Sequence, residues 1–143
     1  MSEEESEKKV VGLTKNVGFQ FSITKTCAVS VDEAWDFLLS ETGVSMWLGD
    51  INFDDFELNN PLTTADGIEA KITLFKADSH LRLAWKPRHW ANNSFIEIRV
   101  LTNGGRAKLG FLHTHMTRLE QREEMKAYWT KIFEKMGLEL AKY

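Results

Sequence analysis

The chain of 143 residues has a single cysteine, two prolines, no long apolar run and no excess of basic residues. With Cys27 alone, an internal disulfide is excluded and a reducing compartment is favoured. A formal net charge of −3 provides no general positive field for a phosphate backbone, which argues against a nucleic-acid partner. The apolar runs are far shorter than the roughly 20 residues of a membrane span, and the acidic start Met-Ser-Glu-Glu-Glu is unlike a secretory signal. We therefore expect a cytoplasmic protein that does not insert into membranes.

Common catalytic signatures are also missing. The sequence contains no glycine-rich phosphate loop, nucleophile elbow, dinucleotide fingerprint or paired-carboxylate motif. Cys27 lies in an apolar-rich strand, so we expect a buried structural thiol, because a reactive thiol needs a cationic and accessible setting. His113 and His115 supply two metal ligands without a third at a recognisable spacing. We expect no cofactor and no metal, and a binding protein is favoured over an enzyme.

The C-terminal segment, residues 117–143, has the strongest helical pattern. At 3.6 residues per turn, one stripe collects Met125, Trp129, Ile132, Phe133, Met136 and Leu140. Thr117 and Glu120 fit a capping box, which predicts that the helix begins there. A helix of this length spans a small domain and needs a broad apolar partner, which the preceding strands provide.

The segments before this helix alternate between apolar and polar residues. This pattern predicts strands at residues 17–24, 68–74, 81–85, 94–101 and 106–116, and a weak strand at 55–58. Ser30 and Glu33 form a second capping box that opens a short helix, and Ser40 caps another that ends at Gly49. The Asn103-Gly104-Gly105 sequence is typical of a hairpin turn.

Together these elements predict two parts of the chain. Residues 1–15 are charged and aperiodic, so we expect a flexible tail. Residues 16–143 form a single α+β domain, in which an antiparallel sheet carries helices on one face.

Four short segments resemble the START/SRPBCC superfamily, whose helix-grip fold curves an antiparallel sheet around a long C-terminal helix. They are Val29–Trp35, Met46–Gly49, Leu81–Pro87 and Gly110–His113, and Tyr128 with Trp129 matches the usual aromatic of the last helix. Within the superfamily, the chain resembles the group named for the C-terminal domain of the activator of heat-shock protein 90 ATPase. The resemblance implies the helix-grip fold, and it implies a small hydrophobic molecule or a chaperone as partner.

The candidate site lies between the sheet and the last helix. If they enclose a cavity, its predicted lining is Trp47, Trp85, Phe111, His113, Arg122, Trp129, Phe133 and Met136. Flat aromatic rings and flexible methionines suit an apolar or aromatic ligand. The alternative is a filled core, in which the same rings touch one another and leave no void.

Two polar residues of this set have alternative roles. His113 and His115 are two residues apart on a strand, which predicts that both rings lie on one face. Either histidine, with Arg122, orients a ligand or moves a proton; alternatively, His113 is a hydrogen-bonded structural residue and His115 is solvated. Arg122 either holds a carboxylate or phosphate head group or extends towards solvent at the helix end. No residue is assigned a catalytic role.

Three functions are compatible with these observations. The first is binding of a small hydrophobic or aromatic molecule by a monomer or weak homodimer. The second is a stress-related protein-interaction module with a chaperone as partner, and the third is a cyclase or hydrolase of aromatic substrates that uses His113. We rank them in this order.

Overall fold

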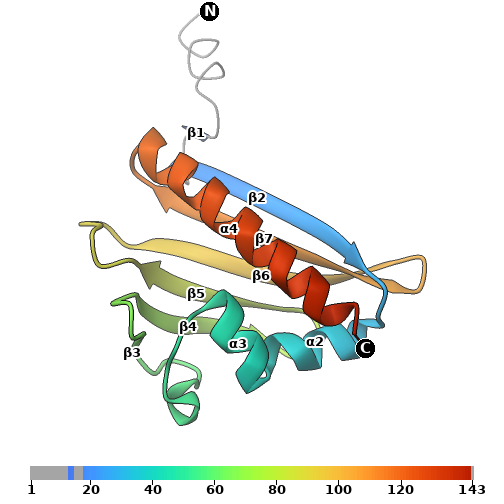
Figure 1. The fold of residues 1–143 in the computed structure, drawn as a ribbon. Helices are drawn as coiled ribbons and strands as arrows, with labels where there is room; N and C mark the ends of the chain where they lie inside the picture. Colours follow the sequence, from blue (N-terminus) through green and yellow to red (C-terminus); the bar gives the residue numbers. More distant parts are fainter. Residues whose placement is uncertain (1–12, 15–17, 143) are drawn as a thin grey trace, which may run out of the picture.

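The computed structural model describes residues 13–14 and 18–142 (Figure 1). Its strands are β1 (Leu13–Thr14), β2 (Gly18–Cys27), β3 (Leu62–Thr63), β4 (Glu69–Lys76), β5 (His80–Lys86), β6 (Ser94–Asn103) and β7 (Arg106–Met116). Its helices are α2 (Val31–Leu39), α3 (Glu41–Trp47) and α4 (Leu119–Leu140), with a 3-10 turn η1 (Phe53–Asp55). The predicted tail, residues 1–15, lies outside the described residues except for β1.

Within the described residues, the strands form one sheet in the order β1-β2-β7-β6-β5-β4-β3, and every pair of neighbours is antiparallel. The helices lie on one face of this sheet, and α4 crosses over β2 and β7 (Figure 1). The predicted α+β helix-grip architecture is therefore confirmed, with two short helices after the first long strand and a long helix at the C-terminal end.

The two short helices begin at the predicted serines. Ser30 Oγ accepts from the Glu33 amide at 3.1 Å, and the Glu33 carboxylate accepts from the Ser30 amide at 3.0 Å, which completes the capping box. Ser40 Oγ accepts from the Gly43 amide at 3.0 Å. Because α2 ends at the residue before Ser40, the two helices follow each other without a loop.

The start of α4 differs from the predicted capping box. The N-cap residue is Arg118, and no side chain of the described residues caps this helix. The Thr117 amide donates to Gln121 Oε1 at 2.9 Å, and the Thr117 hydroxyl donates to Asn92 Oδ1 at 3.2 Å. The predicted box between Thr117 and Glu120 is wrong because Thr117 precedes the N-cap and bonds instead to a loop that is distant in sequence.

The weak strand predicted at residues 55–58 is also wrong. Asn52 Oδ1 accepts from the Asp54 amide at 3.2 Å and starts the η1 turn. Only Leu58 approaches the sheet, through a single parallel bridge to Ile72. The side-chain cap satisfies the backbone locally, which favours a helical turn over an extended strand.

A β-bulge near the end of β7 changes the direction of His115. The pairing of β7 with β2 shifts between Phe19 and Phe21, and His115 has a φ of 66°. The His115 ring packs against Phe95 with the ring centroids 5.1 Å apart, on the face of the sheet away from the helices. His113 faces the core, so the prediction that both histidines share a face is wrong, because regular alternation does not include a bulge.

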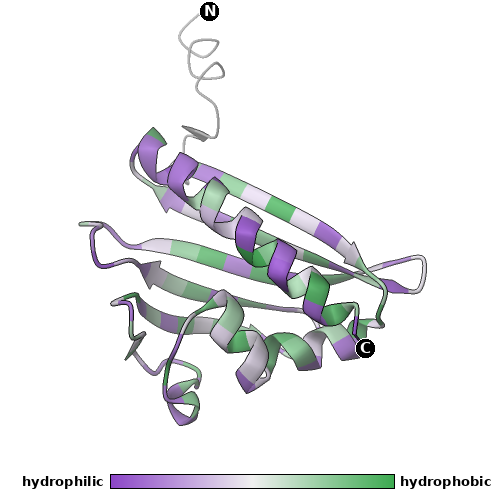
Figure 2. Cartoon of the chain, viewed as in Figure 1, coloured by the Kyte–Doolittle hydropathy of each residue, from purple (hydrophilic) through white to green (hydrophobic). Residues whose placement is uncertain are grey.

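The core lies between the sheet and the helices. The buried side of α4 contains every residue of the predicted apolar stripe, which is confirmed. Figure 2 shows α4 as alternating hydrophilic and hydrophobic bands, as expected for a helix with one apolar face.

Candidate functional site

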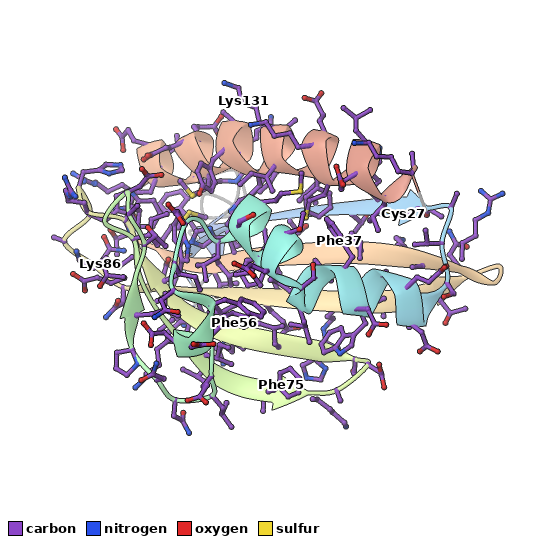
Figure 3. The ribbon with its side chains drawn as sticks, turned by 60° about the horizontal axis from the view of Figure 1, so that its bottom comes forward. Cys27, Phe37, Phe56, Phe75, Lys86 and Lys131 are labelled. Carbon is purple, nitrogen blue, oxygen red and sulfur yellow. The ribbon has the colours of Figure 1, made fainter. Side chains whose placement is uncertain are left out.

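Most of the predicted lining residues meet in the core between the helices and the sheet. Seven of them are at most 3% exposed: Trp47, Trp85, Phe111, His113, Trp129, Phe133 and Met136. They come from α3, β5, β7 and α4, and their positions follow from strand alternation and helix periodicity. Figure 3 shows side chains filling the space between α4 and the sheet, with Phe37 among them.

The aromatic rings of this group contact one another. The Trp129 ring centroid lies 5.8 Å from that of Trp85 and 5.2 Å from that of Phe111. Phe111 in turn lies 4.9 Å from Phe133 and 6.2 Å from Trp47. These distances are those of packed aromatic pairs. The sequence left two alternatives for these rings, an open cavity or a filled core. In this structure they contact one another as in a filled core.

His113 is bonded at both ring nitrogens. Trp129 Nε1 donates to Nδ1 of His113 at 3.0 Å, and His113 Nε2 donates to Ser94 Oγ at 2.8 Å. The Ser94 hydroxyl donates to the Trp85 carbonyl at 2.6 Å. An indole N–H can only donate, so these partners assign the His113 proton to Nε2.

The protonation state of His113 follows from its surroundings. Burial lowers the pKa of His113 to about 3, so the ring is neutral at neutral pH. Neither nitrogen can accept a proton from a substrate unless an existing hydrogen bond breaks. This geometry supports the hydrogen-bonded structural role for His113 more than a proton shuttle.

Arg122 lies apart from the aromatic group. Its Nε donates to the Gln20 carbonyl at 2.8 Å, and its Nη1 lies 2.7 Å from an oxygen of Glu123. The guanidinium carbon also lies 5.7 Å from the ring centroid of Phe21. The structure therefore does not bring Arg122 to His113, and the side chain lies beside β2, where it lines a hollow with Gln20 and Phe21.

Trp85 has an unusual feature at the centre of the group. Its indole Nε1 is buried and makes no hydrogen bond with the described residues. The Trp85 ring contacts three other rings, with centroid-to-centroid distances of 5.0 Å to His113, 5.8 Å to Trp90 and 5.9 Å to Tyr128. An unsatisfied buried donor costs roughly 1–3 kcal/mol, so this atom marks a place where a hydrogen-bond acceptor would be stabilising.

Trp90 and Tyr128 extend the aromatic group beyond the predicted lining. Trp90 Nε1 donates to Glu124 Oε1 at 3.2 Å, and His89 Nε2 lies 2.7 Å from Glu124 Oε2, so the loop after β5 is bonded to α4. Tyr128 is partly exposed. Burial, and to a smaller degree Asp66, raises the pKa of Tyr128. The sequence placed Trp90 in an irregular stretch without periodicity, so no pattern indicated its position.

Ser94 is a further residue that sequence reasoning missed. It lies opposite Trp85 in the pairing of β5 with β6, which brings its hydroxyl to the Trp85 carbonyl. A lone serine at the start of a strand has no distinguishing signal, because its partners depend on the register.

In residues 13–14 and 18–142, no three or more His, Cys, Asp or Glu side chains are grouped so that they could hold a metal ion. In the same part of the chain, no helix combines the length and apolar character needed to cross a bilayer.

Comparison with known proteins identifies the fold. No family model matches the chain, and no curated protein matches its sequence. CalU16 from Micromonospora echinospora is similar in structure, with a TM-score of 0.72 and 17% identity over 83% of this chain and 72% of that one.

Two further proteins are similar in structure. The Aha1 dimer from Colwellia psychrerythraea has a TM-score of 0.69 and 11% identity over 85% of this chain and 96% of that one. PFC0360w, an HSP90 activator from Plasmodium falciparum, has a TM-score of 0.63 and 18% identity over 78% of this chain and 88% of that one. At these identities the similarity establishes the fold alone, which is the helix grip.

Proposed function

We propose that this START/SRPBCC-type helix-grip protein binds a small apolar or aromatic molecule between its sheet and α4, beside Trp85. The observation that supports this most is the buried Trp85 Nε1, which has no hydrogen-bond partner among the described residues. A ligand with an oxygen acceptor would supply the missing bond, while its apolar part packs against the surrounding rings.

The proposed lining keeps most of the residues predicted from the sequence. It consists of Trp47, Trp85, Phe111, His113, Trp129, Phe133 and Met136, which are adjacent in the core. His113 holds the Trp129 ring in place through its hydrogen bond. Arg122 is not included, because its guanidinium is bonded to Gln20 and Glu123 outside this group.

Binding requires the packed rings to move. Tyr128 contacts Trp85 and is partly exposed, so the region beside Tyr128 is the proposed route from solvent to the Trp85 indole. Trp90 lies against the same indole and is bonded to Glu124 of α4. Loosening this bond, together with the His89–Glu124 and Asn92–Gln121 bonds of the same loop, would separate the loop after β5 from α4 and open the route.

The first experiment is native mass spectrometry of the full chain purified from its own host, followed by tryptophan fluorescence titrations with fatty acids, flavonoids and other aromatic compounds. We expect a co-purified molecule or quenching that saturates. Trp85→Phe should weaken binding of oxygen-bearing ligands about tenfold, because one hydrogen bond of roughly 1.5 kcal/mol is lost.

Trp35→Phe is the matched control for this titration. Trp35 is also buried, but it packs against Phe75 at 5.9 Å, away from the proposed lining. This variant should bind as tightly as the natural chain. A bare mass together with no quenching by any compound in the panel would refute the proposal.

A second candidate is a protein-interaction module that binds a chaperone. It is supported by the fold shared with the HSP90 activator PFC0360w and with the Aha1 dimer. The test is calorimetry of the purified chain with HSP90, and absence of heat at micromolar concentrations would exclude this partner. An enzyme acting through His113 has less support, because both ring nitrogens are already bonded.

We also propose that the protein is cytoplasmic. The free, buried thiol of Cys27 fits a reducing cytoplasm. We propose a monomer or a weak homodimer, which the native mass spectrum would distinguish.

A further inference from the structure

Acidic residues are concentrated in the segment that carries the two short helices. Residues 28–68 contain no lysine, arginine or histidine. The carboxylates of this segment are Asp32, Glu33, Asp36, Glu41, Asp50, Asp54, Asp55, Glu57 and Asp66. The segment includes α2, α3 and η1, so the side of the molecule around these elements is strongly negative.

The outer face of the sheet, defined as the face away from the helices, has the opposite charge. The registers and the alternating burial direct every second residue of β5, β6 and β7 to this face. With β4 included, its charged residues are the cations Lys71, Lys76, Arg82, Lys86, Arg99, Arg106 and Lys108 and the carboxylates Glu69 and Glu97. A chain with a net charge of −3 thus has a face on which seven cations stand against two carboxylates.

An apolar hollow lies within this basic face. It has a volume of about 300 Å³ and lies over Gly110, with Arg99, Leu101 and Leu112 in its wall. A second hollow, of about 190 Å³, shares Leu112 and continues to Phe95. Leu101 is 45% exposed. The absence of a side chain at Gly110 helps to form the depression, because a Cβ there would meet only Thr24 Cγ2, at 3.5 Å.

Two arginines are already oriented beside these hollows. The Arg82 guanidinium lies over the Phe95 ring, 4.3 Å from its centroid. Arg99 is directed to its ion-pair partner Glu97 on the same strand. Both guanidinium groups therefore lie at the rim of an apolar floor, where an incoming carboxylate could be paired while an apolar side chain is buried.

We propose that the outer sheet face binds an acidic segment of a partner protein, with an apolar side chain in the hollow over Gly110 and carboxylates paired with Arg82 and Arg99. A phosphate polymer fits less well, because Glu97 and Glu69 interrupt the positive charge and would repel closely spaced phosphates. The negative side around α2 and α3 repels the same partner, so charge alone directs the encounter to the sheet. The proposal is independent of the ligand site beside Trp85.

Fluorescence anisotropy with the full chain tests this surface. The probe is a labelled ten-residue peptide in which aspartate alternates with leucine and phenylalanine, and the charge control replaces each aspartate by lysine. We expect the acidic peptide to bind at least about tenfold more tightly than the basic one and to weaken as salt is added. The double variant Arg82→Glu, Arg99→Glu should lose at least about tenfold in affinity.

Three further variants distinguish the contribution of the hollow to binding from that of the overall charge. Gly110→Leu fills the hollow and should weaken binding, whereas Gly110→Ser leaves most of it open and should not. The double variant Lys131→Glu, Lys135→Glu reverses two exposed charges on α4, where Lys131 points away from the sheet (Figure 3), and should bind normally. Circular dichroism confirms that each variant has the native fold, and Arg99→Gln replaces the double reversal if that variant unfolds.

Several outcomes would overturn the proposal. They are equal binding of both peptides, no binding of the acidic peptide at millimolar concentration, and an equal loss of affinity in the α4 variant. Vesicles of phosphatidylserine and a ten-nucleotide single strand form the second arm of the experiment. Tighter binding to either of these than to the acidic peptide would assign the face to a membrane or to nucleic acid instead.

Discussion

Trp129 Nε1 donates a hydrogen bond of 3.0 Å to His113 Nδ1, and this bond joins α4 to β7 inside the core. His113 then donates to Ser94, and Ser94 donates to the carbonyl of Trp85. Four elements are therefore connected by polar bonds within an apolar interior. In a low-dielectric setting such a network is stabilising only while every member is paired.

Acid should destabilise the protein through His113. Burial lowers the pKa of His113 to about 3, whereas an unfolded histidine titrates near 6.5. Between these values the unfolded chain binds more protons than the folded chain. The contribution of neutral His113 to the free energy of unfolding is therefore fully present above about pH 6.5. It decreases by about 1.4 kcal/mol per pH unit as the pH falls from there towards 3. Urea unfolding at a series of pH values measures this slope.

Two variants separate this titration from the loss of the network. His113→Phe should be less stable at neutral pH and should lose the part of the slope that His113 causes. Trp129→Phe also breaks the network but keeps the histidine, so its slope should remain. Identical pH profiles for His113→Phe and the natural chain would contradict the assignment.

Replacing Trp85 by phenylalanine should cost less stability than the same change at Trp47. Both indoles are buried, but Trp47 Nε1 donates to the Leu38 carbonyl at 2.9 Å, whereas Trp85 Nε1 has no partner among the described residues. Trp47→Phe leaves a buried carbonyl with one bond fewer, while Trp85→Phe removes an unsatisfied donor. We expect a difference in unfolding free energy of about 1–3 kcal/mol, measured by chemical denaturation. Equal losses would indicate that the Trp85 indole is satisfied in solution, for example by a bound water.

Two glycines in helices should respond to alanine in opposite directions. At Gly43 a Cβ would lie 1.8 Å from the Phe37 carbonyl oxygen, so Gly43→Ala forces α3 away from α2 and should destabilise by about 3 kcal/mol or more. At Gly137 the nearest atom is Lys25 Cε at 2.6 Å, the end of a flexible exposed side chain. Gly137→Ala should stabilise by up to about 1 kcal/mol, because alanine has the higher helix propensity. Thermal unfolding compares the two, and a stabilised Gly43→Ala would show that the helices do not pack this closely.

Cys27 should be unreactive until the protein unfolds. Its side chain is 6% exposed, and burial raises the pKa of the thiol against a smaller lowering by Lys25. The thiolate, which is the reactive form, is therefore scarce at neutral pH. Labelling by a thiol reagent should be at least about 100-fold slower in native buffer than in urea. Rapid labelling of the native protein would mean that the end of β2 opens easily.

Local patterns were sufficient for the elements whose stabilising contacts are close in sequence. The capping box of Ser30 and Glu33 spans four residues, and the stripe on α4 repeats within a single helix. Both were predicted and both are confirmed. The predictions that failed depend on distant residues: Thr117 bonds to Asn92, and the bulge at His115 appears only where β7 pairs with β2.

The candidate site was predictable in part. Alternation and helical periodicity placed Trp85, Phe111 and Trp129 on inward faces, and all three are buried. The patterns did not indicate whether these rings would touch or enclose a space. They also did not indicate that Arg122 would bond to Gln20, which is 102 residues away in the chain.

The sequence by itself determined most of the inward-facing residues and the acidic segments, because both properties depend mainly on the order of residues within one element. Only the tertiary structure decided that Trp129 bonds to His113 and that the Trp85 indole has no hydrogen-bond partner among the described residues. It also decided that cations from four strands gather on one face of the sheet. Hydrogen-bond partners and shared faces depend on strand register and on the distance between elements, and packing of the whole chain sets both.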